Sequence, residues 1–295
     1  MNNDLRAQPQ PFPFIVGVGR SGTTLLRLML DAHPEFAIPP ETGFIPAALA
    51  SSRDSSDPKE ALFQAMVGFE TWPDFNIAAE EFRAVLDKLD PFTPVDGIRA
   101  LYRFYAARHG KLRWGDKTPG YALQLPQIAT ALGEARFIHI IRDGRDVALS
   151  IRSLWFAPGK DIQTLALDWR QRIEKTRELS GCVPYYRELR YEDLLRHPRH
   201  ELVSLCDFLE IEYHPHMLLY YHNAENRLSE VKTRYRRDGS VLISKAERLF
   251  NQRFTTMAPE ISRIDRWKHE MDDAEKQEFV RVAGDLLKSL EYEIN

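Results

Sequence analysis

The chain has 295 residues, of which 40 are Lys or Arg and 43 are Asp or Glu, so its formal net charge is −3. This near balance argues against a general nucleic-acid coat or a polybasic membrane anchor, and two cysteines are too few for a disulfide scaffold. No run approaches the roughly 18 to 20 consecutive apolar residues that a membrane helix needs. With 43% hydrophobic and 28% charged residues, the sequence predicts a globular protein with a sizeable core and no membrane span.

Residues 1–11 are polar and carry neither the apolar stretch nor the cleavage site of a secretory signal. We expect this segment to be flexible, and for a complete chain it predicts a cytoplasmic protein. From residue 12 onward, short apolar runs alternate with longer amphipathic stretches, which is typical of an α/β fold with a parallel sheet. No internal repeat breaks the pattern, which favours a single domain over residues 1–295 with helical insertions.

Buried strands are predicted at 14–18 and 136–141, with a weaker strand at 184–189 and a short one at 112–114. A helix is expected over 24–32, directly after the first strand. Further helices are expected through Val147, Ile151 and Leu154, and at about 58–69, 79–89, 97–109, 121–132, 161–180, 198–209 and 273–290.

Three segments lie outside this alternation. Residues 51–58 (SSRDSSDP) predict a polar loop within a helical insertion of about 44–110. Residues 223–258 have no clean period and hold the basic run 232–237. We interpret 223–258 as an excursion over the surface and a candidate lid, whose basic run is typical of a solvated face but would also attract an acidic acceptor.

The sequence GVGRSGTT at residues 17–24 lies between the first strand and the first helix. A glycine-rich turn there directs backbone N–H groups and a helix N-terminus at an anion. The spacing matches a nucleoside-triphosphate loop, but Thr23 holds the place of its lysine, which disfavours ATP or GTP hydrolysis. The alternative is a simple tight turn. The predicted phosphate-binding residues are Gly19, Arg20, Ser21, Gly22, Thr23 and Thr24.

The run FIVGVGRSGTTLLR at 14–27, followed by LDAHP at 30–34 and by Glu41-Thr42, resembles sulfotransferases that use 3′-phosphoadenosine 5′-phosphosulfate (PAPS), especially the tyrosylprotein sulfotransferase-like branch. The resemblance extends along most of residues 12–210. It implies one sulfotransferase domain with a P-loop-type central parallel sheet flanked by helices and with helical insertions. It also implies that the loop at 17–24 cradles the 5′-phosphosulfate of the donor.

A second motif, RDGRDVALS, begins at Arg142 and ends at Ser150, where a strand leads into a helix. An arginine fork beside a hydroxyl suits a dianionic phosphate, although local ion pairs at a helix start are the alternative. The resemblance implies that Arg142 and Ser150 grip the 3′-phosphate of PAPS, a group that ATP lacks.

The resemblance also implies catalytic roles. Glu41 matches the base that accepts the acceptor's proton, and Lys117 matches a lysine beside the bridging oxygen of the donor. With Arg20, Lys117 would stabilise charge on the leaving phosphate. The alternatives are a helix-start carboxylate, an exposed turn lysine, and a histidine base, for which His33 and His139 are poor candidates because of their positions.

Three positions are carried over more loosely. Tyr191 matches a tyrosine beside the adenine, with core packing as the alternative. Arg266 matches a basic residue that closes over the donor phosphates, and either Thr255 or Thr256 would supply a hydroxyl nearby. No metal is expected, because arginine and lysine supply the positive charge.

The sequence therefore predicts a PAPS-dependent sulfotransferase acting on a hydroxyl or phenol, with the insertion at 44–110 shaping the acceptor pocket. A small molecule or lipid is favoured as the acceptor over protein tyrosine. A small-molecule kinase or other P-loop nucleotide enzyme, and a non-catalytic binder of the donor, are the alternatives. A homodimer is expected only because homodimers are common.

Overall fold

The computed structural model describes residues 10–236 and 238–294. The predicted flexible segment at 1–11 therefore lies almost entirely outside the described residues. None of the helices formed within the described ranges has the length and apolar character that a membrane crossing needs.

A four-stranded sheet forms the centre of the molecule, with β1 (Phe12–Gly17), β4 (Asp116–Lys117), β5 (Ala135–Ile141) and β6 (Tyr186–Arg190) in the order β4-β1-β5-β6. All three pairings are parallel. Every residue of β1 and β5 is buried, as expected for central strands of a parallel sheet covered on both faces. The predicted parallel α/β fold and its three longer strands are confirmed.

The short predicted strand at 112–114 forms as β3 (Arg113–Trp114), but it pairs with β2 (Phe36–Ala37) in a separate two-stranded sheet. The fourth strand of the central sheet is instead β4, two residues further on. Gly115 separates the two, and a Cβ atom there would come within 2.7 Å of the Pro13 ring. Strands of two residues are too short to show a period in the sequence, which is why β2 and β4 were not predicted.

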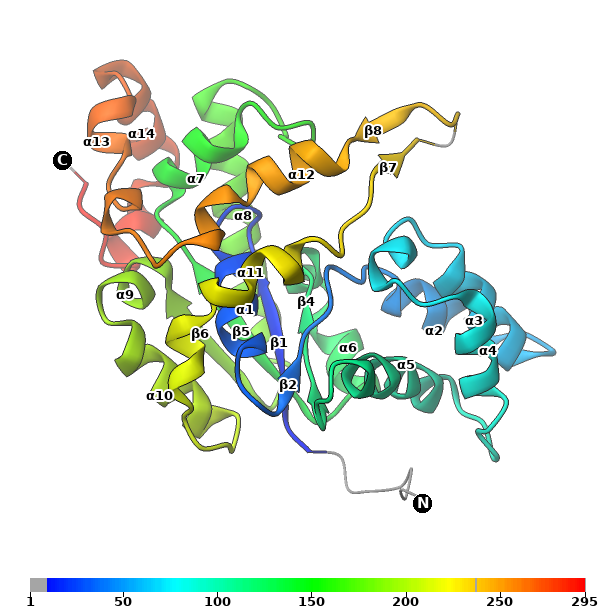
Figure 1. Ribbon diagram of the computed structural model, residues 1–295. Helices are drawn as coiled ribbons and strands as arrows, with labels where there is room; N and C mark the ends of the chain where they lie inside the picture. Colours follow the sequence, from blue (N-terminus) through cyan, green and yellow to red (C-terminus); the bar gives the residue numbers. More distant parts are fainter. Residues whose placement is uncertain (1–9, 237, 295) are drawn as a thin grey trace.

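Helices cover both faces of this sheet. Figure 1 shows α1 (Thr23–Asp31) in front of it and α8 (Ile162–Ser180) behind it. Behind the sheet, α7 (Gly144–Ile151) and α14 (Asp273–Ser289) join α8 in a second apolar cluster, in which Trp169 and Phe279 are buried. The predicted helix through Leu154 ends earlier, at Ile151.

The remaining predicted helices are present with shifted ends. They are α3 (Pro58–Val67), α4 (Ala79–Leu86), α5 (Pro94–Arg108), α6 (Leu125–Ala131) and α10 (Pro198–Phe208). Helices that were not predicted include α9 (Tyr191–Arg196), α13 (Trp267–Glu270) and the short 3-10 turns Trp72–Phe75, Pro119–Leu123, Pro215–Leu219, Arg253–Thr256 and Ile261–Arg263.

The insertion forms a helical lobe to one side of the sheet, where α2 (Ile45–Arg53) lies with α3, α4 and α5 (Figure 1). The predicted loop at 51–58 is wrong for its first three residues, which belong to α2, and for its last, which begins α3. The Ser51 and Ser52 hydroxyls donate to the carbonyl of Ala48 at 3.1 and 2.7 Å, so the polar side chains are satisfied within the helix.

The segment at 223–258 folds as α11 (Tyr221–Leu228), a hairpin of β7 (Arg234–Tyr235) and β8 (Val241–Ile243), and α12 (Lys245–Asn251). In Figure 1 the hairpin projects from the body, and α11 and α12 cross in front of the sheet. The segment is therefore an ordered part of the front face as well as a surface excursion.

Candidate active site

The loop between β1 and α1 has the backbone that an anion site requires. Gly22 has φ +96° and is the N-cap of α1, a left-handed conformation that favours glycine. A Cβ atom at Gly22 would also lie 2.4 Å from the ring of Tyr191. Glycine is therefore needed at this position for both its conformation and its close contact with Tyr191.

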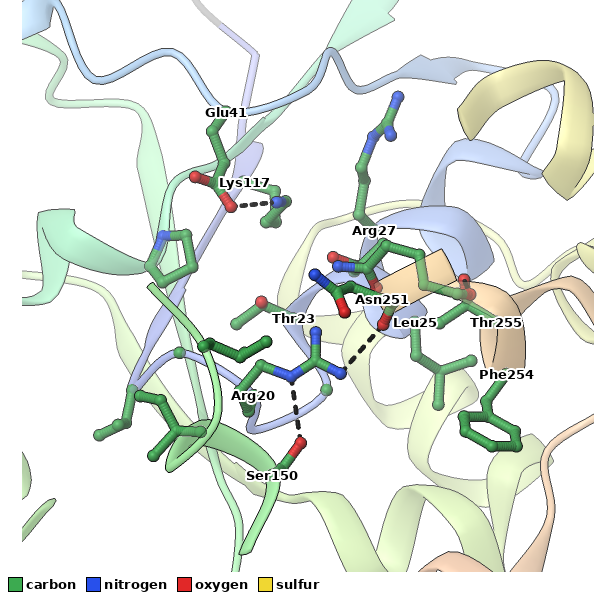
Figure 2. A pocket seen from close by; sticks show the side chains of 18 of the residues that line it. Arg20, Thr23, Leu25, Arg27, Glu41, Lys117, Ser150, Asn251, Phe254 and Thr255 are labelled. Carbon is green, nitrogen blue, oxygen red and sulfur yellow. Dashed lines mark hydrogen bonds and ion pairs between the residues drawn. The ribbon is translucent and has the colours of Figure 1, made fainter. Parts of the chain in front are cut away.

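A cavity of about 430 Å³ opens at this loop and extends along the carboxyl ends of β1 and β5 (Figure 2). Ligands of open α/β folds bind at this edge of the sheet. The predicted site residues that line it are Gly19, Arg20, Gly22, Thr23, Thr24, Glu41, Lys117, Arg142, Ser150 and Tyr191. Ser21, in the same loop, does not line the cavity. Its side chain is fully buried, and its hydroxyl has no partner among the described residues.

The two predicted phosphate-binding motifs meet at one end of the cavity. Arg20 Nε donates to Ser150 Oγ at 3.1 Å, and Arg142 donates to the carbonyl oxygens of Arg20 and Arg263 at 3.2 and 2.7 Å. Arg142 Nε is buried without a partner in the described part of the chain. Its guanidinium lies 4.6 Å from the centre of the Tyr191 ring, so Tyr191 contacts both motifs.

This end of the cavity concentrates positive charge. Burial, together with the neighbouring guanidinium groups of Arg142, Arg263 and Arg253, lowers the pKa of Arg20 to about 10. A guanidinium surrounded by others of like charge gains from binding an anion. The electrostatics therefore favour a phosphorylated ligand here.

Glu41 and Lys117 lie at the other end, and their side chains are ion-paired at 2.8 Å between Oε1 and Nζ (Figure 2). Lys117 is 6% exposed and Glu41 39% exposed. Burial alone would raise the pKa of Glu41, but Lys117, with Arg234 and Arg248 further off, lowers it overall. Burial lowers the pKa of Lys117, and Glu41 opposes that effect.

Neither histidine considered as a base lines the cavity. His33 contacts the Glu212 carbonyl through Nε2 at 2.9 Å. His139 is fully buried in β5, where its Nδ1 lies 2.6 Å from the Tyr186 hydroxyl, and burial lowers its pKa to about 4.

Arg266 does not line the cavity either. Its side chain pairs instead with Glu270 at 2.6 Å. Arg263 lines the cavity in its place, and of the two threonines it is Thr255 that does so. Because Arg263 is three residues from the position indicated by the family resemblance, sequence matching alone gave no signal that would have selected it.

Part of the cavity wall comes from the segment at 223–258, and none of it comes from the insertion. Residues of that segment lining it are Leu228, Val231, Arg234, Ile243, Arg248, Leu249, Asn251, Gln252, Phe254 and Thr255. The insertion at 44–110 contributes no lining residue. It contacts this wall through Asp74, which accepts hydrogen bonds from Arg248 at 2.9 and 2.7 Å. Arg234, from the basic run, is 11% exposed and not solvated as expected.

The fold and the site together define an α/β protein whose cavity has an arginine-rich glycine loop at one end and a carboxylate–ammonium ion pair at the other. Over residues 11–215 the chain matches the sulfotransferase family. This match covers more than half of the sequence, and the chain belongs to that family.

Individual proteins similar to this chain are also sulfotransferases. A putative protein-tyrosine sulfotransferase of Caenorhabditis briggsae is 32% identical over 217 residues, which cover 70% of this chain and 67% of that protein. Protein-tyrosine sulfotransferase 1 of Danio rerio is 30% identical over 257 residues, 82% of this chain and 62% of that protein. The chain spans between 32% and 67% of the length of the first four curated relatives.

Solved structures share the fold. The sulfotransferase domain of the Synechococcus PCC 7002 olefin synthase matches with a TM-score of 0.62 at 24% identity, over 97% of this chain and 96% of that one. The sulfotransferase domain of the curacin biosynthetic pathway matches with a TM-score of 0.61 at 22% identity, over 98% and 100%.

Proposed function

We propose that this sulfotransferase moves the sulfuryl group of PAPS in line to the hydroxyl or phenol of a small molecule or lipid. The observation that carries the proposal is the pair of anion-binding motifs on one cavity, joined by the hydrogen bond from Arg20 to Ser150. PAPS has a phosphate on each side of its ribose, so it requires two such motifs at once.

Each step uses residues that line the cavity. The acceptor oxygen attacks sulfur while the bond from sulfur to the 5′-phosphate oxygen breaks, and Glu41 takes the hydroxyl proton. Lys117 and Arg20 stabilise the negative charge that the departing 5′-phosphate gains. Adjacent placement of the base and the cation is consistent with both acting on the same transferred group.

The acceptor class is proposed from the cavity lining outside the two anion motifs. Apolar residues of this lining are Pro40, Leu228, Val231, Ile243 and Leu249, which suit the apolar body of a phenol or lipid. The cavity volume of about 430 Å³ lies in the range of small-molecule sites, roughly 300 to 1,000 Å³. We further propose that residues 223–258 close over the donor, since they form part of the cavity wall and the Asn251 carbonyl accepts from Arg20 at 3.0 Å.

The experiment is a comparison of ligands by thermal shift, followed by an acceptor screen. Adenosine 3′,5′-bisphosphate (PAP) should raise the melting temperature more than ADP at equal concentration, since stabilisation follows RT ln(1 + [L]/Kd). Acceptor mixtures of phenols, hydroxylated lipids and tyrosine peptides are then incubated with PAPS and examined for an added mass of about 80, the mass transferred in line. Equal or greater stabilisation by ADP would contradict the proposal, and modification of the peptides alone would contradict the acceptor class.

A further inference from the structure

Five buried polar side chains lie directly behind the Glu41–Lys117 pair and connect the two chain segments that carry it. We propose that they act as a clasp that positions the base and the cation for transfer. The clasp consists of Thr42, Tyr102, Asp116, Thr118 and Tyr121. The inference rests on the function proposed above and concerns residues that do not line the cavity.

Sequence alternation puts the clasp and the site on opposite sides. Asp116 and Lys117 form β4 and pair with Phe14 and Ile15 of β1. Successive side chains of a strand point to opposite faces, so Lys117 reaches the cavity while Asp116 points away from it. Thr42 likewise follows Glu41, and it is Glu41 that lines the cavity.

The hydrogen bonds of the clasp converge on Thr42 and Asp116. The hydroxyls of Thr42 and Tyr102 donate to Asp116 Oδ2 at 2.8 and 2.6 Å. The Thr42 backbone N–H donates to Thr118 Oγ1 at 3.0 Å. Thr42 is thus joined to residues 116 and 118, about 75 positions away, on both sides of Lys117.

Tyr121 extends the clasp into the insertion. Its hydroxyl accepts from the backbone N–H of Ile45 at 3.0 Å and lies 2.8 Å from Thr42 Oγ1. Thr42 has a single hydroxyl hydrogen, which it donates to the Asp116 carboxylate, so the bond between Thr42 and Tyr121 is donated by the Tyr121 hydroxyl. Thr42 therefore has a defined hydroxyl orientation, and the start of α2 is tied to the segment that carries Glu41.

The clasp contains a carboxylate that burial disfavours. Asp116 is fully buried, and burial raises its pKa to about 6 despite the hydrogen bonds from Tyr102 and Thr42. Its Oδ1 has no hydrogen-bond partner among residues 10–236 and 238–294. A side chain with only a structural role at this buried position would be more stable if it were neutral. We therefore attribute the buried Asp116 carboxylate to its electrostatic effect on the neighbouring Lys117.

The test is Thr42→Val, which keeps the shape of the side chain and removes its hydroxyl. Thr42→Ser restores the hydroxyl as the conservative variant. The matched control is Thr176→Val in α8, since Thr176 is 1% exposed and donates to the Arg172 carbonyl at 2.7 Å. For each protein, calorimetry gives the dissociation constants of PAP and PAPS, and chromatography gives the rate at which PAPS is converted to PAP.

We expect Thr42→Val to keep the PAP affinity, because PAP lacks the sulfate that Lys117 approaches. Its preference for PAPS over PAP should fall about tenfold, the scale of one hydrogen bond to a charged group, and PAP release should slow with it. Loosening the ion pair should also move the acidic limb of the rate–pH profile to higher pH, since Lys117 holds the pKa of Glu41 down. Thr42→Ser and Thr176→Val should behave as wild type.

Two results would overturn the inference. One is a Thr42→Val protein with the wild-type PAPS preference, rate and pH profile. The other is a parallel loss of PAP and PAPS affinity, which indicates a structural role only. If Thr42→Val does not fold, Tyr102→Phe removes a single donor from Asp116 and carries the same expectations. Failure of the wild-type protein itself to prefer PAP over ADP would instead contradict the proposed function.

Discussion

Arg20 and Ser150 are 130 residues apart in the chain, and the guanidinium Nε of one donates to the hydroxyl of the other at 3.1 Å (Figure 2). This contact joins the loop after β1 to the helix after β5, which are neighbours in the parallel sheet. Parallel strands bring their carboxyl ends to one edge, so two motifs that follow such strands meet in space. The contact is also one that a bound phosphate would compete for.

Removal of Arg142 and Ser150 should abolish recognition of the 3′-phosphate. The double variant Arg142→Ala/Ser150→Ala is expected to lose roughly 100-fold or more in PAP affinity, since hydrogen bonds to charged groups contribute about 1.5–3 kcal/mol each. Its affinity for AMP should change little. Calorimetry with both nucleotides measures this, with Arg152→Ala at the end of α7 as the control. Undiminished discrimination between PAP and AMP would remove these residues from the donor site.

Arg263 and Arg266 form a matched pair for the donor-closing role. Arg263 lines the cavity, so Arg263→Ala should weaken PAP binding about 10-fold or more through loss of a charge-assisted contact. Arg266 pairs with Glu270 outside the cavity lining, and Arg266→Ala should have little effect. The reverse order of dissociation constants would favour the residue indicated by the family resemblance.

Lys117→Ala should reduce turnover by roughly 100- to 1,000-fold, the scale of one lost transition-state donor. The pKa of Glu41 should rise in the same variant, because Lys117 lowers it. Steady-state rates with the acceptor from the screen measure the loss. Lys175→Ala is a suitable control, since Lys175 is half exposed and pairs with Glu178 at 2.6 Å. A near-native rate would exclude Lys117 from the chemistry.

Glu41→Gln should reduce turnover by about 100- to 10,000-fold if Glu41 is the general base. The pKa of Glu41 is lowered from its usual value, so the ionised base is present at neutral pH. Rates are compared with those of Glu178→Gln, which alters an exposed carboxylate. Unchanged turnover at neutral pH would indicate another base or an acceptor that is already ionised.

Stability should fall in acid partly because of His139. Burial lowers its pKa to about 4, so the unfolded chain takes up a proton before the folded one does. His139 therefore lowers the free energy of unfolding by roughly 3 kcal/mol as the pH falls from about 6.5 to 4, and has no such effect above pH 6.5. Asp116 acts in the opposite sense over pH 6 to 4, because its pKa is raised.

The difference between wild type and His139→Gln isolates the histidine. Denaturant unfolding at several pH values should give a smaller decrease between pH 6.5 and 4 for the variant. Parallel curves for the two proteins would mean that His139 takes up its proton in the folded state as easily as in the unfolded chain.

The sequence was sufficient for the long elements and for placing both predicted phosphate motifs directly after buried strands. Strand β5 and helix α8 have continuous periods, and the loop at 17–24 has its glycines at fixed spacing. The two-residue strands β2 and β4 were not predictable, because pairing with neighbours and not local pattern creates them. Residues 51–53 were taken for loop because serine is typical of loops, whereas in α2 the Ser51 and Ser52 hydroxyls donate to the Ala48 carbonyl.

The sequence alone determined the features that follow from the local preferences of a few residues, such as the tight turn made by the glycines of the loop at 17–24. Which side chains share the cavity was decided by the tertiary structure, as with Arg263 in place of Arg266 and the wall from residues 223–258 in place of the insertion. A local pattern fixes backbone shape within a few residues. The direction of a side chain on an irregular segment depends instead on contacts with distant parts of the chain, such as those of Arg248 with Asp74.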